Sequence, residues 1–347
     1  MKKVLIVGAF GFDGEYNDGQ TVKTRELYYG LCEKIGSENI DYIETIGWKK
    51  NPIKLLLSFF NKAKCSESII MLPAQNGIYV FSRLLLFAKR LFKNRIYYDV
   101  IGGWVGNLLE KQKRLKKCLI SFDSIWVETS VLKKQLLNLG FNNIEIIRNF
   151  KNLQIVNLDD KKPIDKDCLK LCIFSRINYM KGISDAINVV ALINNEKDQE
   201  VKLDIYGPIA DEYENDFRNL LEEHNTQINY KGVVSPLSSV DILKDYDALL
   251  FPTKYKNEGL PGTIIDAYAA GVPVISARWD SFFDIVEEGK TGIGYTINDL
   301  KELKEAIIWA IKNRELLYRM KINCTKKAKE FLRETVVDEL IEKGFFD

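Results

Sequence analysis

The apolar positions of the chain form short runs that alternate with stretches of helical spacing. An apolar run bounded by glycine or polar residues predicts a strand buried on both faces of a sheet. In the first half of the chain, such strands are predicted at 4–7, 41–46, 68–71, 95–100, 124–128 and 144–147. Helical stretches lie between several of them, and this alternation predicts a parallel sheet with helices on both faces.

The alternation is interrupted at residues 151–167, where the chain is polar and charged and carries Pro163. A segment of this composition predicts an inter-domain linker. Beyond it, further strands are predicted at 169–174, 202–207, 228–231, 248–251 and 274–276. Helices are predicted at 182–194, 212–223, 240–244, 262–270 and over most of 300–346.

These patterns predict an α/β protein of two Rossmann-like, doubly wound parallel-sheet domains that face each other across a cleft. A chain of 347 residues fits two domains of about 100–200 residues each. We place the first domain at 1–155 and the second at 168–325. The last helix, 326–347, is expected to pack back on the first domain.

Composition and charge argue against several classes of protein. The chain has 50 Lys and Arg residues against 48 Asp and Glu residues, and a net charge of +2 does not favour a nucleic-acid partner. None of the six cysteines is spaced as in a zinc knuckle or a redox motif, so we expect reduced thiols and a cytoplasmic protein. No uncharged apolar run reaches about 18 residues, so no transmembrane helix is expected.

The segment 251–275, FPTKYKNEGLPGTIIDAYAAGVPVI, carries the strongest chemical signal. A predicted strand leads into a polar loop with Glu258, and a glycine-containing turn then begins a helix that contains Asp266. Backbone N–H groups at a helix start suit a diphosphate, and ionised carboxylates accept hydrogen bonds from sugar or ribose hydroxyls. The residues of this segment that we assign to binding such a ligand are Glu258, Gly259, Leu260, Pro261, Gly262 and Asp266.

This segment resembles the signature of the family 4 glycosyltransferases, in which two Glu residues stand in a context like EGxPxxxxEAxAxGxPVI. The other matching residues are Gly259, Pro261, Ala267, Ala269, Gly271, Pro273, Val274 and Ile275. The second acid here is Asp266, which is one methylene shorter than Glu and so reaches less far toward a ribose. The resemblance implies the GT-B fold and a nucleotide-diphosphate sugar donor, with a UDP-sugar as the first expectation.

A second block, IFSRINYMKG at 173–182, resembles the family's strand-end motif, in which an Arg and a Lys bind the donor diphosphate. The resemblance assigns that role to Arg176 and Lys181. Two cations that stabilise the departing diphosphate lower the barrier without a metal. A surface Arg and Lys at a helix start are the alternative interpretation. The resemblance also places Gly207 and Val233, in two further strand-end loops, at the donor nucleotide.

The glycine-rich segment 8–27, GAFGFDGEYNDGQTVKTREL, resembles the family's first loop, which closes over the donor phosphates and helps to bind the acceptor. Its glycines do not form GxGxxG, so a nicotinamide-binding domain is not predicted. The candidate residues of this loop are Gly11, Asn17, Asp18 and Gly19. Asp18 is equally suited to be a helix N-cap.

The segment 99–104, DVIGGW, ends a predicted strand where many family members carry a histidine that lines the acceptor site. The one histidine of this chain is His224, at the end of a predicted surface helix in the second half. We therefore expect Asp99, Gly103 and Trp104 to line the acceptor site instead. Trp104 either stacks on a sugar or packs in the core, since Trp is mostly buried in proteins.

Family 4 members retain configuration at the anomeric carbon, so the resemblance implies retention here. No carboxylate pair like that of the retaining hydrolases is identified, so we expect front-face displacement, in which the leaving diphosphate takes the acceptor proton. Arg176 and Lys181 would stabilise the leaving group, and Glu258 would orient the sugar. Neither a metal nor a cofactor is expected.

Many family members act in bacterial-type cell-surface polysaccharide assembly, so the expected acceptor is a saccharide or a lipid-linked saccharide. Segments 49–64 and 82–95 are both basic and apolar, and helices of this kind can lie on an anionic membrane, here its inner face. A core helix with a solvated basic face is the alternative. The alternative function is a catalytically degenerate GT-B partner subunit, because the histidine is missing and Asp266 replaces Glu.

Overall fold

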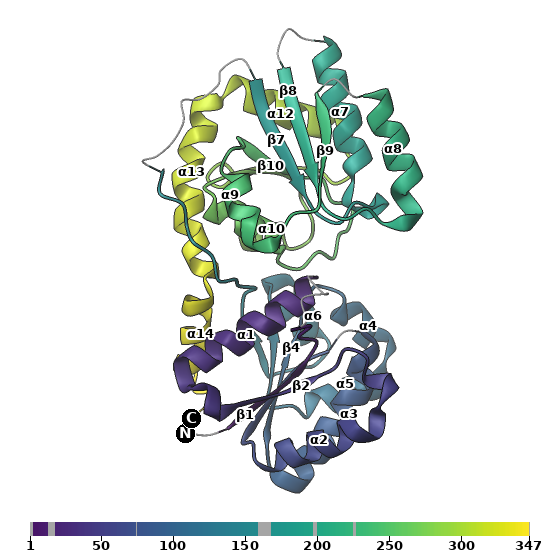
Figure 1. Ribbon diagram of the computed structural model, residues 1–347, viewed down its shortest axis with the longest axis vertical. Coiled ribbons are helices and arrows are strands. Elements are labelled where there is room, and N and C mark those ends of the chain that lie inside the picture. The colour runs from purple at the N-terminus through teal and green to yellow at the C-terminus, as the bar shows by residue number, and fades with distance from the viewer. Residues whose placement is uncertain are drawn as a thin grey trace. The chain divides into compact units, whose positions relative to one another are not determined.

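The computed structural model describes residues 3–12, 18–73, 75–158, 168–196, 200–224 and 227–346. The chain divides into two compact units (Figure 1). Unit 1 comprises Met1–Asn152 and Phe331–Asp347, and unit 2 comprises Leu153–Glu330. Each unit is an α/β domain with its own parallel sheet, as the alternation of strands and helices predicts.

The sheet of unit 1 has six parallel strands in the order β2-β1-β3-β4-β5-β6. The strands are β1 (Val4–Gly8), β2 (Ile40–Glu44), β3 (Ser68–Leu72), β4 (Arg95–Asp99), β5 (Ser124–Val127) and β6 (Ile144–Ile146). Each coincides with a predicted strand, because strands covered on both faces are apolar at most positions and stand out in the sequence.

Helices cover both faces of this sheet (Figure 1). They are α1 (Gly19–Ile35), α2 (Pro52–Lys64), α3 (Gln75–Phe92), α4 (Val105–Lys111), α5 (Lys113–Ile120), α6 (Ser130–Asn138) and α14 (Arg333–Glu342). Side chains alternate along a strand, so Leu5 and Val7 pack with α2 to α6, whereas Val4 and Ile6 pack with α1 and α14. The sheet therefore separates two apolar cores.

The end of the chain returns to unit 1 and is bonded into it. The Lys151 N–H donates to the Phe331 carbonyl at 3.0 Å, and the Arg333 N–H donates to the Lys151 carbonyl at 2.9 Å. The Arg333 guanidinium also binds the carboxylates of Glu26 and Glu33 on α1, at 3.2 and 2.6 Å. Helix α14 is therefore one of the helices that cover the unit 1 sheet.

The boundaries of the two units differ slightly from the expected ones. Unit 1 ends at Asn152 rather than at 155, because the Val156 N–H already donates to the Ala269 carbonyl of unit 2, at 2.9 Å. The returning segment begins at Phe331 rather than at 326, because the helix before it packs within unit 2. Residues 159–167 of the predicted linker lie outside the described residues.

The sheet of unit 2 also has six parallel strands, in the order β12-β11-β10-β7-β8-β9. They are β7 (Cys168–Phe174), β8 (Glu200–Tyr206), β9 (Ile228–Gly232), β10 (Ala248–Phe251), β11 (Val274–Ala277) and β12 (Gly292–Tyr295). The sequence does not predict β12, because Gly292 and Gly294 interrupt its apolar run. A Cβ on Gly292 would lie 2.5 Å from the Val274 carbonyl oxygen, so glycine lets this strand approach β11.

Seven helices accompany this sheet in the part of unit 2 that the structure describes. They are α7 (Ile183–Glu196), α8 (Glu214–Glu223), α9 (Ser239–Leu243), α10 (Gly262–Ala269), α11 (Phe282–Ile285), α12 (Leu300–Lys312) and α13 (Arg314–Ala328). Helix α13 packs against α10, which lies within the segment 251–275 that carries the strongest sequence motif. Across the described ranges of both units, no helix combines the length and the apolar character that crossing a bilayer requires.

The contact between α1 and α14 gives a testable prediction at Gly30. A Cβ on this glycine would lie 2.7 Å from Cγ2 of Val337, closer than packed carbon atoms approach. We expect Gly30→Ala to lower the free energy of unfolding by about 1 kcal/mol, because overpacking outweighs the gain in helix propensity. Gly19→Ala, in the same helix with open space around it, is the matched control. Urea unfolding measures both, and stabilisation by Gly30→Ala would contradict the packing argument.

Candidate functional site

The predicted donor residues of unit 2 come from loops that leave the carboxyl ends of neighbouring strands. Strands β7 and β10 are parallel neighbours, so the loops that follow them begin at the same edge of the sheet. The loop after β7 carries Arg176 and Lys181, and the loop after β10 carries Glu258. Parallel pairing therefore brings together residues that lie far apart in the sequence.

Lys181 and Glu258 form an ion pair across these two loops. The Lys181 ammonium binds Oε1 of Glu258, and the Thr253 hydroxyl donates to the same oxygen at 3.0 Å. The ammonium also lies 5.6 Å from the ring centroid of Phe251, at the end of β10. Oε2 of Glu258 has no hydrogen-bond partner among the described residues, so it remains able to accept from a hydroxyl.

Glycine allows the close contact between the two loops. Gly182 has a φ of +67°, and a Cβ there would lie 1.9 Å from the carbonyl oxygen of Pro252. The Lys254 N–H donates to the Met180 carbonyl at 2.8 Å and closes the contact. The position of Lys181 beside Glu258 is thus fixed by backbone packing as well as by charge.

Arg176 differs from Lys181 in its surroundings. Its side chain is exposed, and its guanidinium has no ion-pair or hydrogen-bond partner within the ranges that the structure describes. An unpaired guanidinium beside a sheet edge is available to bind an anion such as a phosphate in bidentate fashion. Of the two predicted cations, Lys181 is brought to Glu258 and Arg176 stays free.

The start of α10 forms the rest of this edge. Pro261 precedes the helix in an extended conformation, and the Thr263 hydroxyl is buried with no hydrogen-bond partner among the described residues. The Leu260 side chain is buried, so only its backbone could meet a ligand. Asp266 is also buried, with 5% of its surface exposed, and its contact with a ribose stays a prediction.

Gly207 and Val233 lie at the same sheet edge, after β8 and β9. The Gly207 N–H donates to the Gly232 carbonyl at 2.9 Å, and a Cβ on Gly207 would lie 1.9 Å from the Ser175 carbonyl oxygen. Val233 is exposed. The residues predicted from the donor resemblance therefore share one edge of the unit 2 sheet.

In unit 1, the predicted first loop is described only in part. Asn17 lies outside the described residues, and Gly19 begins α1. The Asp18 carboxylate accepts hydrogen bonds from the backbone N–H groups of Gln20 and Thr21, at 2.9 and 3.0 Å, so Asp18 is the N-cap of α1. The N-cap role that the sequence allows for Asp18 is therefore confirmed, and its contact with a ligand stays a prediction.

Gly11 is held at the carboxyl end of β1 by two charged side chains. Its N–H donates to the carboxylate of Glu44 at 2.9 Å, and its carbonyl accepts from the guanidinium of Arg25 at 3.0 Å. Glu44 also accepts from the N–H groups of Phe10 and Ile46. The described part of the loop is therefore fixed from both sides.

The expectation that Asp99 lines an acceptor site is wrong for its side chain. Asp99 is the last residue of β4 and lies beneath α1, with 1% of its surface exposed. The ammonium of Lys23 on α1 binds it at 2.7 Å and also binds Glu128 at 3.2 Å. Asp99 is therefore buried in a charged cluster and cannot meet a ligand directly.

Trp104 makes core contacts, as one of its two predicted roles requires, and its stacking on a sugar stays a prediction. It is half-buried and packs against the core on the α2 to α6 side of the sheet. Its indole N–H donates to the Ile101 carbonyl at 2.9 Å, which closes the turn through Gly102 and Gly103. Residues 101–104 of this turn are partly exposed, whereas Asp99 is buried.

Sequence reasoning missed Lys23 and Glu128, although the sequence carries a signal for the first. Lys23 stands at the spacing of Leu27 and Leu31, which are buried, so it occupies the core-facing side of α1. A lysine at such a position needs a buried anion. Glu128 follows the buried strand β5, and nothing in its local pattern distinguishes it from a surface acid.

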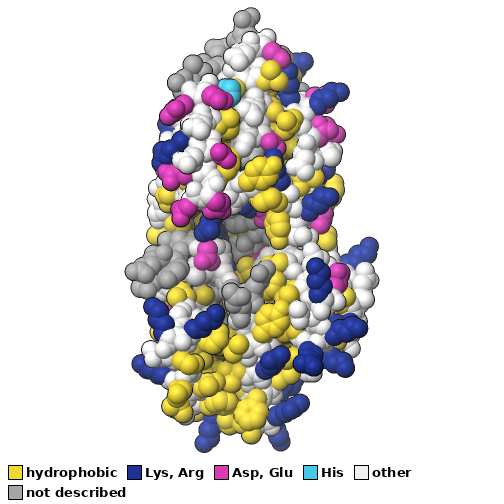
Figure 2. Space-filling view, turned by 90° about the vertical axis from the view of Figure 1, so that its right-hand side faces the viewer, with side chains coloured by type: hydrophobic (Ala, Val, Ile, Leu, Met, Phe, Trp, Pro, Cys, Tyr) yellow, Lys and Arg dark blue, Asp and Glu magenta, His cyan; other side chains and the backbone are white. Residues whose placement is uncertain are grey.

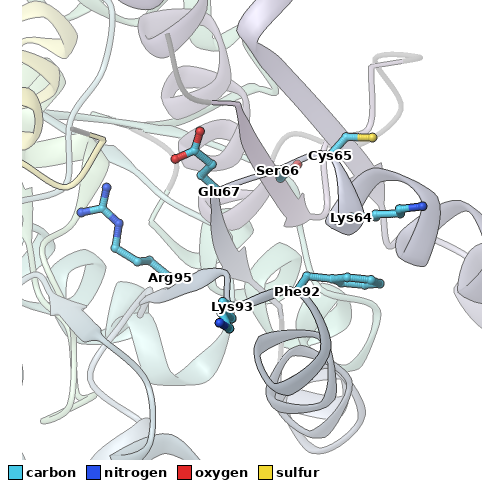
Figure 3. A pocket seen from close by; sticks show the side chains of 7 residues that line it. All are labelled: Lys64, Cys65, Ser66, Glu67, Phe92, Lys93 and Arg95. Atoms are coloured by element: carbon cyan, nitrogen blue, oxygen red, sulfur yellow. The ribbon is translucent and has the colours of Figure 1, made fainter.

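A shallow hollow of about 360 Å³ lies elsewhere on unit 1, at the amino ends of β3 and β4 (Figure 3). It is lined by Lys64, Cys65, Ser66, Glu67, Phe92, Lys93 and Arg95. Its cationic side chains point in different directions rather than toward one another, so they do not converge on a ligand (Figure 3). Within the described ranges, no cluster of His, Cys, Asp and Glu is suited to hold a metal ion.

Comparisons with known proteins agree with the fold of the two units. Residues 155–327, which make up almost all of unit 2, match the family model of the glycosyl transferases group 1. The structure of HepE from Anabaena in complex with UDP superposes with a TM-score of 0.76 at 14% identity, covering 98% of this chain and 99% of HepE. The protein has the fold of a GT-B glycosyltransferase.

Two further proteins extend this likeness. The lipopolysaccharide outer core galactosyltransferase WaaB superposes on this GT-B chain with a TM-score of 0.70 at 17% identity, over 99% of both chains. An uncharacterised glycosyltransferase of Methanocaldococcus jannaschii is 26% identical over 308 residues, which cover 81% of this chain and 74% of that protein. Together, the family match and these likenesses support glycosyltransferase activity.

The buried cluster of unit 1 predicts a pH dependence of stability. Burial raises the pKa of Asp99 to about 6, the charge of Glu128 adds to this, and Lys23 opposes it. Because this pKa lies above the unfolded value of about 3.9, the stabilising contribution is full below pH 4 and is lost as the pH rises through 6. A shift of this size corresponds to at most about 3 kcal/mol.

Asp99→Asn removes the titrating group and tests this prediction. We expect the free energy of unfolding of the wild type to fall, relative to that of Asp99→Asn, as the pH is raised from 4 to 7.5. Urea unfolding at several pH values measures the difference. Parallel pH profiles for the two proteins would contradict the raised pKa of Asp99.

Proposed function

We propose that this protein transfers a sugar, with retention of configuration, from a UDP-sugar to a saccharide or a lipid-linked saccharide. The observation that carries the proposal is the pairing of Lys181 with Glu258 at the sheet edge of unit 2, together with the unpaired Arg176. Among the described residues, one oxygen of Glu258 and the guanidinium of Arg176 have no partner there and can bind a sugar hydroxyl and a diphosphate. This combination suits a nucleotide-diphosphate sugar better than a simple anion.

The proposal of UDP as the nucleotide is supported by structural similarity to a protein solved with UDP. HepE from Anabaena has been solved with UDP and with UDP-glucose, and its fold matches this chain over 98–99% of its length. Backbone contacts hold a nucleobase without a sequence signature, so UDP is an inference from fold and not from Val233. No resident cofactor is needed, because the sugar nucleotide carries both the sugar and its leaving group.

The proposed chemistry is a front-face displacement. The bond from the anomeric carbon to the diphosphate oxygen breaks, the bond to the acceptor oxygen forms on the same face, and the acceptor proton passes to the leaving diphosphate. Arg176 and Lys181 would stabilise the negative charge that develops on that group, in place of a metal ion. Glu258 would accept a hydrogen bond from a sugar hydroxyl through its free Oε2 and so orient the donor.

This mechanism predicts that Arg176→Ala lowers kcat by roughly 100-fold to 1000-fold, since it removes a charge that acts mainly on the leaving group. Glu258→Gln keeps the shape of the side chain but loses its pairing with Lys181, and we expect a comparable loss. Arg218→Ala is the matched control, because Arg218 is an exposed arginine on α8 that pairs with Glu214. The measurement is UDP release from a panel of UDP-sugars with saccharide acceptors.

The outcomes separate the proposal from its alternative. Equal rates for Arg176→Ala and Arg218→Ala would contradict the role of Arg176. A wild-type protein that binds UDP but releases none from any donor would favour a catalytically degenerate partner subunit, for which the replacement of Glu by Asp266 and the missing histidine already argue. Inversion at the anomeric carbon of the product would contradict retention.

The surface of unit 1 has features that suit a membrane, where a lipid-linked acceptor would be found. Residues 48–120 contain fifteen Lys and Arg but only three Asp and Glu, whereas the whole chain has a net charge of +2. This range includes α2 and α3, which carry exposed apolar side chains. Ile53 and Leu57 of α2 are 74% and 64% exposed, and Phe87 and Leu91 of α3 are 52% and 54% exposed. We name these four side chains the α2/α3 face.

The α2/α3 face combines exposed apolar groups with surrounding cations. The rings of Phe60 and Phe87 lie 5.8 Å apart, so α2 and α3 are neighbours. Figure 2 shows apolar side chains gathered on the lower unit, with Lys and Arg around them. Apolar groups that enter the acyl region beside cations that meet anionic headgroups suit a membrane surface. We propose that this face binds the inner face of an anionic membrane, where a lipid-linked acceptor would be available.

Vesicle flotation tests this surface. We expect the wild type to float with phosphatidylglycerol vesicles at low ionic strength, and far less with phosphatidylcholine vesicles. Leu57→Asp/Leu91→Asp should weaken binding about tenfold or more, because two apolar side chains no longer enter the bilayer. Leu237→Asp, at a fully exposed leucine of unit 2, is the control. Equal binding by the double variant and the control would contradict the α2/α3 face.

A further inference from the structure

Lys23, Asp99 and Glu128 form a buried charged cluster at the carboxyl edge of the unit 1 sheet. The Lys23 ammonium lies 2.7 Å from Oδ1 of Asp99 and 3.2 Å from Oε1 of Glu128. Each of the three side chains is at most 3% exposed. The cluster joins α1 to the ends of β4 and β5, three elements that are separated in the sequence.

Stability alone gives little reason for this cluster. It buries two carboxyl groups for one ammonium, and Oδ2 of Asp99 has no hydrogen-bond partner among the described residues. Taking charges out of water is costly, and buried ion pairs are often replaced by apolar side chains without loss of stability. Burial opposes the charge of Lys23, yet the two carboxylates outweigh it and keep its pKa raised, so Lys23 stays charged.

The cluster is connected to the loop 101–104 through a backbone hydrogen bond to Glu128. The Gly102 N–H donates to Oε2 of Glu128 at 3.2 Å, and Gly102 has a φ of +79°, which favours glycine. Lys23 holds Glu128 through its other carboxylate oxygen. The position of the loop is thus set by the charge pairing beneath it, and Trp104 closes the same turn from the other side.

The cluster also fixes the beginning of α1. Lys23 lies one turn after Asp18, the N-cap, and Gln20 in the same turn donates through Nε2 to the Leu72 carbonyl at 2.7 Å. Loop 101–104 and the start of α1 are therefore tied to each other through Lys23. Both belong to the part of unit 1 that the sequence assigns to the acceptor.

We propose that Lys23, Asp99 and Glu128 are positioning residues that hold loop 101–104 and the start of α1 in the conformation that binds the acceptor. None of the three touches a substrate, because all are buried. The proposal rests on the proposed function in one respect, namely that the ligand of this loop is the acceptor. Loss of the cluster should then raise the KM for the acceptor and leave the KM for the UDP-sugar unchanged.

The direct test compares two variants of Glu128. Glu128→Ala removes the carboxylate oxygen to which the Gly102 N–H donates, whereas Glu128→Gln keeps a carbonyl oxygen at that place. We expect Glu128→Ala to raise the acceptor KM roughly tenfold to 100-fold, since a small displacement of a binding loop has effects of this size. Glu128→Gln should restore part of the affinity, because its carbonyl oxygen can still accept from the Gly102 N–H although the charge that pairs with Lys23 is lost. Glu110→Ala, at an exposed acid on nearby α4, is the control. An unchanged acceptor KM in Glu128→Ala, or equal rises in both KM values, would overturn the proposal.

Amide hydrogen exchange supplies a readout that needs no activity. The Gly102 amide should exchange about tenfold faster in Glu128→Ala, whereas the Gly11 amide, held by Glu44, should not change. Unchanged exchange at Gly102 would overturn the positioning role whatever the activity. If the wild type transfers no sugar, the proposed function fails and the exchange result alone decides whether the cluster holds the loop.

Should Glu128→Ala fold poorly, Lys23→Met/Asp99→Leu/Glu128→Leu replaces the whole cluster by apolar side chains, which we expect to be tolerated. This variant also lacks the carboxylate oxygen to which the Gly102 N–H donates its hydrogen bond. We therefore expect a folded protein with a raised acceptor KM and an unchanged UDP-sugar KM. A folded variant with a wild-type acceptor KM would show that the cluster is only structural.

Discussion

The close passage of the backbone at Gly182 past the carbonyl of Pro252 is the constraint on which the candidate donor site depends. Strands β7 and β10 run parallel as neighbours, so their loops start side by side, but only a residue without a side chain lets those loops touch. The contact delivers the ammonium of Lys181 to the carboxylate of Glu258. The ion pair neutralises the carboxylate of Glu258, which would otherwise repel an anionic substrate. Within the described ranges, the second oxygen of Glu258 and the guanidinium of Arg176 have no partner.

The charged side chains at the carboxyl edge of the sheet differ in exposure and pairing between the two units. In unit 2, the charged groups at the carboxyl edge are partly exposed. Arg176 has no partner in the part of the chain that the structure describes, which suits a ligand that brings its own negative charge. In unit 1, the charged groups at that edge are buried and paired with each other through Lys23. Their effect on a ligand can only pass through the backbone they hold, at Gly102 and at the start of α1. The carboxyl edge of the unit 2 sheet thus presents charged side chains, whereas that of unit 1 presents backbone groups held in position by a buried cluster.

The sequence predicts the fold well because parallel strands covered on both faces are apolar along most of their length. It fails at β12, where Gly292 and Gly294 are needed for close approach to β11 and conceal the strand. The candidate donor residues stand out in the sequence because a helix start, glycines and carboxylates follow one another locally between 251 and 275. Asp99 is misassigned because its burial depends on Lys23, which arrives from α1. Such a contact between residues far apart in the sequence leaves little local signal. The sign of it here is Lys23, a lysine at a core-facing position of α1.

The most direct test of the central claim is amide hydrogen exchange of the whole protein with and without saturating UDP. If the carboxyl edge of the unit 2 sheet binds the donor, slower exchange should appear in 175–182 and in 255–263, the two segments joined by Lys181 and Glu258. The same segments should show no protection in Arg176→Ala at equal UDP concentration. Protection confined to unit 1, or none in either unit, would contradict the account.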